Sequence, residues 1–117
     1  MTASDQRTVR YFYEAVAAWN LDATDACNLI GIRPCDWKIE QFAEPSEEAL
    51  AQMMMVVQIR TALDISWGTP LANEWIRLPN AGDPYQGLSP VAYVAEHGWP
   101  GLYYILRQVQ ARAVGNY

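Results

Sequence analysis

Apolar residues recur at the helical period at both ends of the chain. The first stripe, at spacings i, i+3, i+4 and i+7, consists of Val9, Phe12, Tyr13 and Val16. The last stripe, at i, i+3, i+4, i+7 and i+11, consists of Leu102, Ile105, Leu106, Val109 and Ala113. Each stripe predicts a helix with one buried face. We expect the first helix to be capped by Ser4 and to end near Asn20, and the last to open around Pro100.

A pair of short helices is predicted after the first stripe. One should span residues 23–30, with Asp22 or Thr24 as its cap and Gly31 just past its end. A proline then begins a second helix, expected over residues 34–43. A helix, a glycine-containing turn and a helix form the outline of a helix-turn-helix.

The longest predicted helix occupies the middle of the chain. It begins near Ser46 and runs to about Ile65, and its apolar residues cover almost the whole circumference. Such a helix must be surrounded by protein. Because so small a chain can hardly enclose it alone, we expect part of it to pack on a second copy or on a partner. The candidate dimerisation residues are Met53, Met54 and Val57.

Glycine and proline become frequent after Trp67, which predicts a more punctuated C-terminal part. A short helix is expected to start at Gly68–Pro70, followed by a loop rich in turn formers. Ser89 and Pro90 should open another short helix, which ends near Gly98. No strand is predicted. The expected fold is therefore all-α, either as one domain or as two small helical subdomains that share one core. A helix-turn-helix-like part with the long central helix is expected over 1–66, and a C-terminal part over 67–117.

Composition restricts the class of partner. The 117 residues are 51% hydrophobic and 12% aromatic, and carry a net charge of −5. Five Trp and seven Tyr are many for this length and favour a protein-binding surface, where such rings are enriched. Strong non-specific binding to nucleic acid is disfavoured by the acidic charge, which suits a basic partner protein. No signal peptide or membrane span is recognised, so the cytoplasm is the expected location.

The sequence does not predict an enzyme. His97 is the only histidine and falls at a predicted helix end, and Cys27, Cys35 and His97 lack the spacing of a zinc site. Cys27 is interpreted as a small buried residue where two helices cross. The acidic pairs Glu47–Glu48 and Asp22–Asp25 lie at helix starts, where the helix dipole favours them. No phosphate-binding glycine motif occurs, so neither a metal nor a cofactor is expected.

DNA binding by the helix-turn-helix is predicted to be weak. Reading base edges needs cations or amides near the start of the second helix. Only Arg33 and Lys38 are available, and Asp36 and Glu40 oppose them. Weak binding through a dimer or a larger complex stays open.

The C-terminal part resembles the toxin-binding domain of the Xre/MbcA/ParS antitoxin family, and is most like ParS. The resemblance is carried by the run EWIRLPN over residues 74–80, by Gly87 with Ser89–Pro90, by Gly98 before an aliphatic helix, and by an ending of glycine, one residue and an aromatic. In the N-terminal half Leu21, Cys27, Gly31 and Pro34 match the family's degenerate helix-turn-helix. The resemblance covers about four fifths of the chain.

This resemblance implies a type II antitoxin without catalysis. Its partner would be a RES-domain toxin, which consumes NAD by hydrolysis or by ADP-ribosyl transfer and is neutralised when the antitoxin covers its NAD cleft. A homodimer holding two toxins, or a larger assembly, is implied. The expected toxin-binding residues are Trp75, Asn80, Pro90, Arg107, Arg112, Gly115, Asn116 and Tyr117.

These residues are expected to play different parts. Asn116, Tyr117 and a terminal carboxylate are suited to plug the cleft, with the carboxylate meeting a toxin arginine; the alternative is a frayed tail. Arg107 and Arg112 either pair with toxin carboxylates or are solvated. Trp75 and Asn80 are expected to support the domain more than to touch the toxin.

Two other functions remain open at this point. One is an Xre-type DNA-binding autorepressor whose C-terminal part only mediates oligomerisation. The other is an adaptor whose partner is not a toxin.

Overall fold

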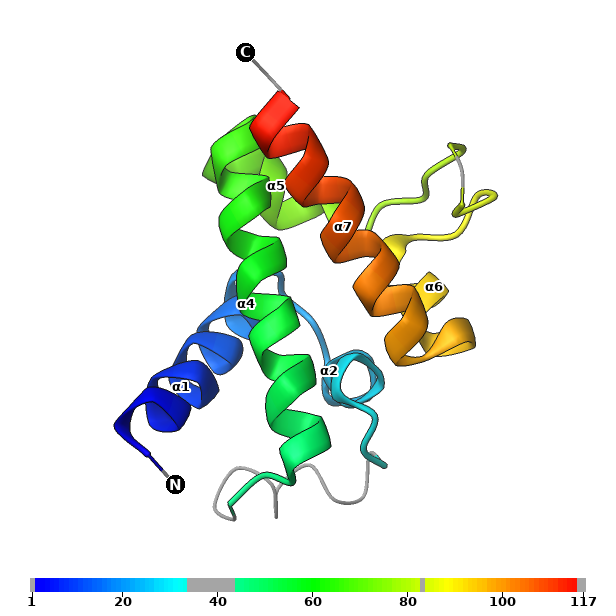
Figure 1. Ribbon diagram of the computed structural model, residues 1–117. Helices are drawn as coiled ribbons and strands as arrows, with labels where there is room; N and C mark the ends of the chain where they lie inside the picture. Colours follow the sequence, from blue (N-terminus) through cyan, green and yellow to red (C-terminus); the bar gives the residue numbers. More distant parts are fainter. Residues whose placement is uncertain (1, 34–43, 83, 116–117) are drawn as a thin grey trace.

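The computed structural model describes residues 2–33, 44–82 and 84–115, and this part of the chain is all-helical (Figure 1). Its helices, in chain order, are α1 (Ala3–Ala18), α2 (Ala23–Ile30), α4 (Glu47–Trp67), α5 (Thr69–Trp75), α6 (Pro90–His97) and α7 (Trp99–Gly115). The predicted all-α class is confirmed. The second helix of the predicted helix-turn-helix, over 34–43, lies outside the described residues and stays a prediction.

Helix α1 begins earlier than expected because Thr2, and not Ser4, is its N-cap. The Thr2 hydroxyl accepts a hydrogen bond from the Asp5 amide at 3.0 Å, and the Asp5 carboxylate accepts one from the Thr2 amide at 3.3 Å. This reciprocal pair is a capping box, which satisfies two amides at once. Ser4 lies in the first turn, where its carbonyl accepts a bond from the Thr8 hydroxyl.

Helix α2 starts and ends as predicted. The Asp22 side chain accepts a bond from the Asp25 amide at 2.8 Å. Gly31 ends the helix with φ of 71°, in the left-handed region that glycine adopts without a Cβ penalty. The neighbourhood of Gly31 is also tight, because an added Cβ would lie 3.3 Å from the Gln52 side chain.

Helix α4 is the central helix. Helices α1 and α2 pack on its lower half, and α5 and α7 lie beside its upper half (Figure 1). The Ser46 hydroxyl caps it by accepting a bond from the Ala49 amide at 3.1 Å. The side chains that α4 buries are Ala49, Met53, Val56, Ile59, Ala62 and Leu63. The chain therefore encloses more of this helix than its length suggested, because helices from both halves pack against it.

The core is continuous across the expected boundary near residue 66. One cluster of buried residues joins Phe12 and Trp19 of the N-terminal part to Tyr85, Leu102 and Ile105 of the C-terminal part. Helices α2 and α6 also pack on each other directly. Helices α4 and α2 thus pack against the inner side of the C-terminal part, and the outer face of α7 is left uncovered by the other described helices.

Candidate binding surface

A series of aromatic side chains, each in contact with the next, runs through the C-terminal part. Trp67 at the end of α4 contacts Trp75 of α5, with ring centroids 5.5 Å apart. Trp75 meets Tyr85 edge-on at 5.9 Å, and Tyr85 meets Tyr93 at 5.4 Å. Tyr93 lies against His97 at 4.3 Å. Trp75, which the sequence suggested for support more than for toxin contact, is a half-buried link that joins α5 to the loop and, through Tyr85, to α6.

Tyr85 anchors the loop to α7. Its side chain is 1% exposed, and its hydroxyl donates to Oε1 of Gln108 at 2.6 Å. Burial, with a smaller contribution from Tyr93 and Tyr104, raises the pKa of the Tyr85 phenol above its ordinary value. The phenol consequently stays protonated and keeps this hydrogen bond at any physiological pH.

Asn80 closes the loop between α5 and α6. Its backbone amide donates to the Leu88 carbonyl at 3.1 Å, and its own carbonyl accepts from the Gly87 amide at 2.8 Å. Its side-chain oxygen accepts from the Gly82 amide at 2.9 Å, an Asx-type turn. Of the predicted contact residues, Asn80 thus supports the loop, as the sequence suggested.

Pro90 serves the same supporting purpose at the start of α6. It is buried, and it follows the Ser89 cap, whose hydroxyl accepts from the Ala92 amide at 3.2 Å. The adjacent amide of Val91 donates to the Ile76 carbonyl at 3.1 Å, which joins α6 to the end of α5. A buried proline cannot offer its ring to a partner in this conformation.

The two arginines of α7 have different surroundings. The Arg112 guanidinium lies over the Trp67 ring, 4.5 Å from its centroid. It lines a hollow with Trp67, Trp75, Asn80 and Gln108. Arg107 points elsewhere: its Nη1 donates to the Tyr103 hydroxyl at 3.3 Å, and it is exposed. The structure therefore separates Arg107 and Arg112, for which the sequence suggested the same role.

The predicted tail contacts are described only in part. Gly115 is exposed at the end of α7, whereas Asn116 and Tyr117 lie outside the described residues.

On the outer face of α7, the sequence analysis named Arg107 as a candidate contact but missed Tyr103 and Tyr104. Tyr103 and Tyr104 are 45% and 49% exposed. A hollow of about 420 Å³ there is lined by Pro100, Tyr103, Tyr104, Arg107 and Gln108. These five residues follow the spacing i, i+3, i+4, i+7 and i+8, which is a second helical stripe beside the buried one. The signal was present in the sequence, because this stripe combines tyrosine with arginine.

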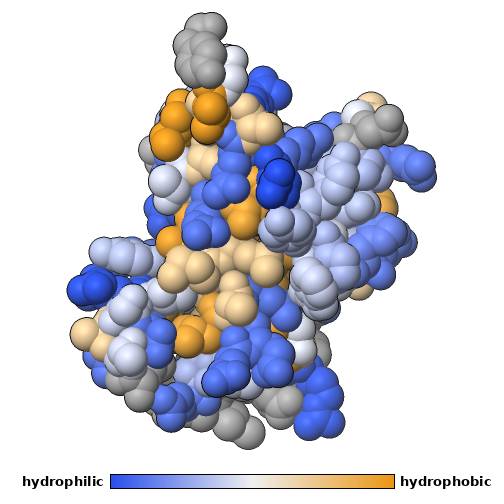
Figure 2. Space-filling view, in the orientation of Figure 1, coloured by the Kyte–Doolittle hydropathy of each residue, from blue (hydrophilic) through white to orange (hydrophobic). Residues whose placement is uncertain are grey.

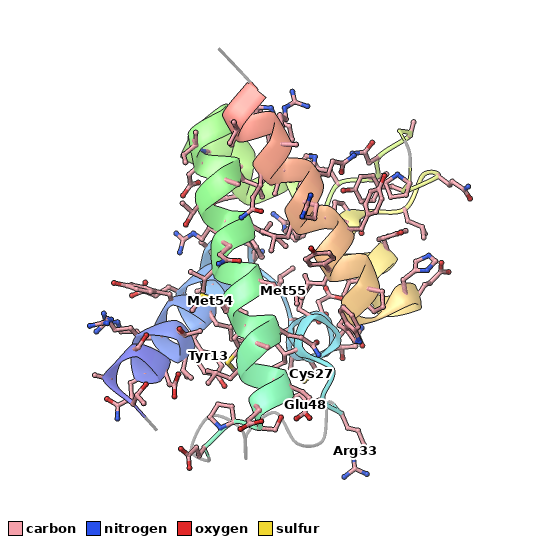
Figure 3. The ribbon with its side chains drawn as sticks, in the orientation of Figure 1. Tyr13, Cys27, Arg33, Glu48, Met54 and Met55 are labelled. Atoms are coloured by element: carbon pink, nitrogen blue, oxygen red, sulfur yellow. The ribbon has the colours of Figure 1, made fainter. Side chains whose placement is uncertain are left out.

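The candidate dimerisation residues do not share one environment. Met53 is fully buried in the core, so assigning it to a dimer surface is wrong in this conformation: it packs within its own chain. Met54 is 39% exposed, and Val57 is half-buried. Figure 3 shows Met54 on the outward side of α4.

An apolar groove lies between the upper parts of α4 and α7. Its apolar lining is Val57, Ala62, Ile65, Ala113 and Val114, and its polar lining is Gln58, Thr61 and Gln110. Figure 2 shows apolar colours along α4 and at the end of α7. Ile65 and Val114, 68% and 66% exposed, leave two large aliphatic side chains in water.

The remaining candidates stand apart from this surface. Arg33 extends away from the body below α2 (Figure 3), and Lys38 lies outside the described residues. Cys27 is fully buried, as expected.

Two titratable groups also lie apart from this surface. His97 ends α6 on the surface, with its Nε2 3.9 Å from a Glu96 carboxylate oxygen. Partial burial, and less strongly Asp22, raises the pKa of Asp25, but that carboxyl lies in the first turn of α2 and lines none of the hollows described above.

Within the described ranges, no three His, Cys, Asp or Glu side chains gather where they would hold a metal ion. In the same part of the chain, no helix combines the length and apolar character needed to cross a bilayer. Comparisons of the chain with models of protein families, with curated proteins and with solved structures found no match.

Proposed function

We propose that this chain is an antitoxin of a type II toxin–antitoxin system that binds a RES-domain toxin in the cytoplasm and blocks its NAD cleft. The proposal starts from the resemblance of residues 74–117 to the toxin-binding domain of the Xre/MbcA/ParS family. Neutralisation of this kind requires a shaped surface on the antitoxin and no reactive group.

The single observation that best supports the proposal is the rigid build of the C-terminal part. Its characteristic residues have definite structural tasks: Asn80 closes the loop, Ser89 and Pro90 start α6, and Trp75 joins them through Tyr85. A preorganised surface binds more tightly, because little conformational freedom is lost on docking. The same framework holds α7 with its tyrosines and Arg107 facing water, the residue types that are enriched at protein interfaces.

Self-association through the groove between α4 and α7 is part of the proposal. Val57 lines this groove, Met54 lies about one helical turn before it on α4, and none of the lining residues is charged. Two copies of an acidic chain repel each other least where uncharged faces meet. A homodimer joined there would present two C-terminal parts, each to one toxin.

The test is co-expression with a candidate RES-domain toxin. We expect the two proteins to purify together, and NAD turnover by the toxin to fall to background when the antitoxin is in slight molar excess. The toxin alone and the toxin with an unrelated small acidic protein are the controls. Undiminished NAD turnover by a mixture at micromolar concentrations would falsify the proposal. A shift of the chain's own promoter DNA without any effect on the toxin would favour the autorepressor instead.

A further inference from the structure

Charge is divided unevenly between the two parts of this acidic chain. Residues 1–66 contain ten acidic and five basic residues, so they carry the entire net charge of −5. Residues 67–117 contain three of each and are neutral. Helix α7 contains Arg107 and Arg112 and no acidic residue. Net charge, which suggested a basic partner, therefore describes the N-terminal part and not the surface of α7.

The outer stripe of α7 combines aromatic area with one available cation. Tyr103 and Tyr104 expose nearly half of their side chains beside Arg107, around the hollow next to Pro100. Trp99, which is 56% exposed, precedes Tyr103 by four residues and extends the same side of the helix. Exposed Trp, Tyr and Arg grouped around a hollow are the residues that carry most binding energy at protein interfaces.

Arg107 is held in place but is not neutralised. Its guanidinium donates to the Tyr103 hydroxyl at 3.3 Å and lies 6.0 Å from the centre of that ring. No carboxylate of the described residues forms an ion pair with it. A guanidinium with donors to spare beside exposed rings pairs well with a carboxylate, because such a charge-assisted bond becomes stronger once a docked partner displaces the water around it.

We infer that this stripe of α7 is the docking surface for an acidic patch of a protein partner, with Arg107 receiving a carboxylate and the tyrosines covering it. The inference rests on the proposed function, since it describes the chemistry of the toxin surface that meets the antitoxin. A nucleic acid is disfavoured as the occupant. A phosphate backbone requires several cations, whereas this stripe has one, and residues 1–66 carry the net negative charge, which repels polyanions.

The experiment measures the affinity of purified variants for the RES-domain protein by isothermal titration calorimetry at low and high salt. Arg107→Glu reverses the charge, Arg107→Gln removes it, and Tyr103→Phe removes only the hydroxyl that orients the guanidinium. Arg10→Glu is the matched control, because Arg10 is also an exposed helical arginine over a tyrosine, 5.1 Å from the Tyr11 ring on α1. Thermal unfolding of each variant verifies the fold.

We expect Arg107→Glu to weaken binding by about 10-fold or more and to flatten its salt dependence, because it removes a charge pair and adds a repulsion. Arg107→Gln should weaken binding less than Arg107→Glu does. Tyr103→Phe should weaken it two- to threefold, on the order of one weak hydrogen bond, and Arg10→Glu should leave it unchanged.

Unchanged toxin affinity in Arg107→Glu overturns the inference and leaves the proposed function standing. Loss of self-association with unchanged toxin affinity overturns it too, since the occupant is then a second copy. A toxin that binds none of the proteins, wild type included, overturns the proposed function and this inference together.

Discussion

The guanidinium carbon of Arg112 lies 4.5 Å from the centre of the Trp67 ring, which ties the last turn of α7 to the last residue of α4. Trp67 in turn contacts Trp75, 5.5 Å away between centroids. The contact therefore connects three helices at the end of the molecule where the chain leaves α7.

Replacement of Arg112 by Ala is expected to lower stability. An exposed cation–π contact contributes about 0.5–1 kcal/mol, and that is the loss we expect in the free energy of unfolding. Urea unfolding followed by circular dichroism measures it. Arg107→Ala is the control and should change stability by less than about 0.5 kcal/mol, because the hydrogen bond that Arg107 donates is to the exposed Tyr103. Equal losses in the two variants would contradict the structural distinction between these arginines.

Tyr85→Phe should cost about 1 kcal/mol of stability, the net contribution of its hydrogen bond to Gln108. It should also change the alkaline pH dependence. The folded pKa of Tyr85 is raised above the ordinary value of 10.0, so near and above pH 10 the unfolded chain loses this proton while the folded chain keeps it. Stability of the wild type then falls as pH rises. Tyr85→Phe should lack this fall in stability when urea unfolding is measured between pH 8 and 11. If the stability of wild type and variant changed with pH in parallel, the result would argue against a buried, protonated Tyr85.

Gly31→Ala is expected to destabilise the end of α2. The residue has φ of 71°, which costs an L-residue with a Cβ about 1–2 kcal/mol. The new methyl group would also lie 3.3 Å from the Gln52 side chain. Gly31→Asn tolerates the backbone better and should cost less than alanine if conformation dominates. Thermal unfolding of both variants separates the two causes, since a steric cause makes asparagine the worse substitution.

Ile65→Glu should reduce self-association without unfolding the chain. The side chain is 68% exposed beside the groove between α4 and α7, so glutamate loses little burial within the monomer but places two like charges in a symmetric dimer. Sedimentation velocity over a concentration series should report a dissociation constant raised by about 10-fold or more. Arg10→Glu, on α1, serves as the control for added negative charge. A dimer that is unaffected would have to form elsewhere.

Removal of Gly115 to Tyr117 is expected to weaken neutralisation and to leave stability unchanged. Gly115 is the exposed last residue of α7, and an added Cβ there would meet no atom within 4 Å, so we expect its removal to cost little packing. The expected loss comes from the proposed plug in the NAD cleft. Titration of the truncated chain against the NAD turnover of the toxin measures it, and full protection at the wild-type ratio would show that the tail is dispensable.

Helix boundaries could be predicted well because they depend on neighbours in the chain. The caps at Asp22, Ser46 and Ser89 are hydrogen bonds to amides three residues ahead, and Gly31 is selected by one backbone angle. The error at Ser4 has the same local origin. Two capping residues lay two positions apart, and the reciprocal bond between Thr2 and Asp5 decided between them.

The surface could be predicted only in part. The apolar stripe of the last helix identified its buried face, and the opposite stripe with Tyr103 and Arg107 follows from the same period. The partners of these side chains could not be read in this way. Arg107 and Arg112 are five residues apart on one helix, and only the position of Trp67, brought from α4, decides that one arginine packs on a ring while the other faces water.

By itself, then, the sequence determined that this chain is helical, where most helices begin and end, and which residue types reach the surface of α7. Only the tertiary structure decided which side of α4 is buried and which is exposed. Because apolar residues surround that helix, periodicity assigns it no unique inner side, and Met53 and Met54 are equivalent in the sequence. The packing of α1, α2, α5 and α7 buries Met53 and leaves Met54 exposed, since burial depends on contacts between residues far apart in the chain.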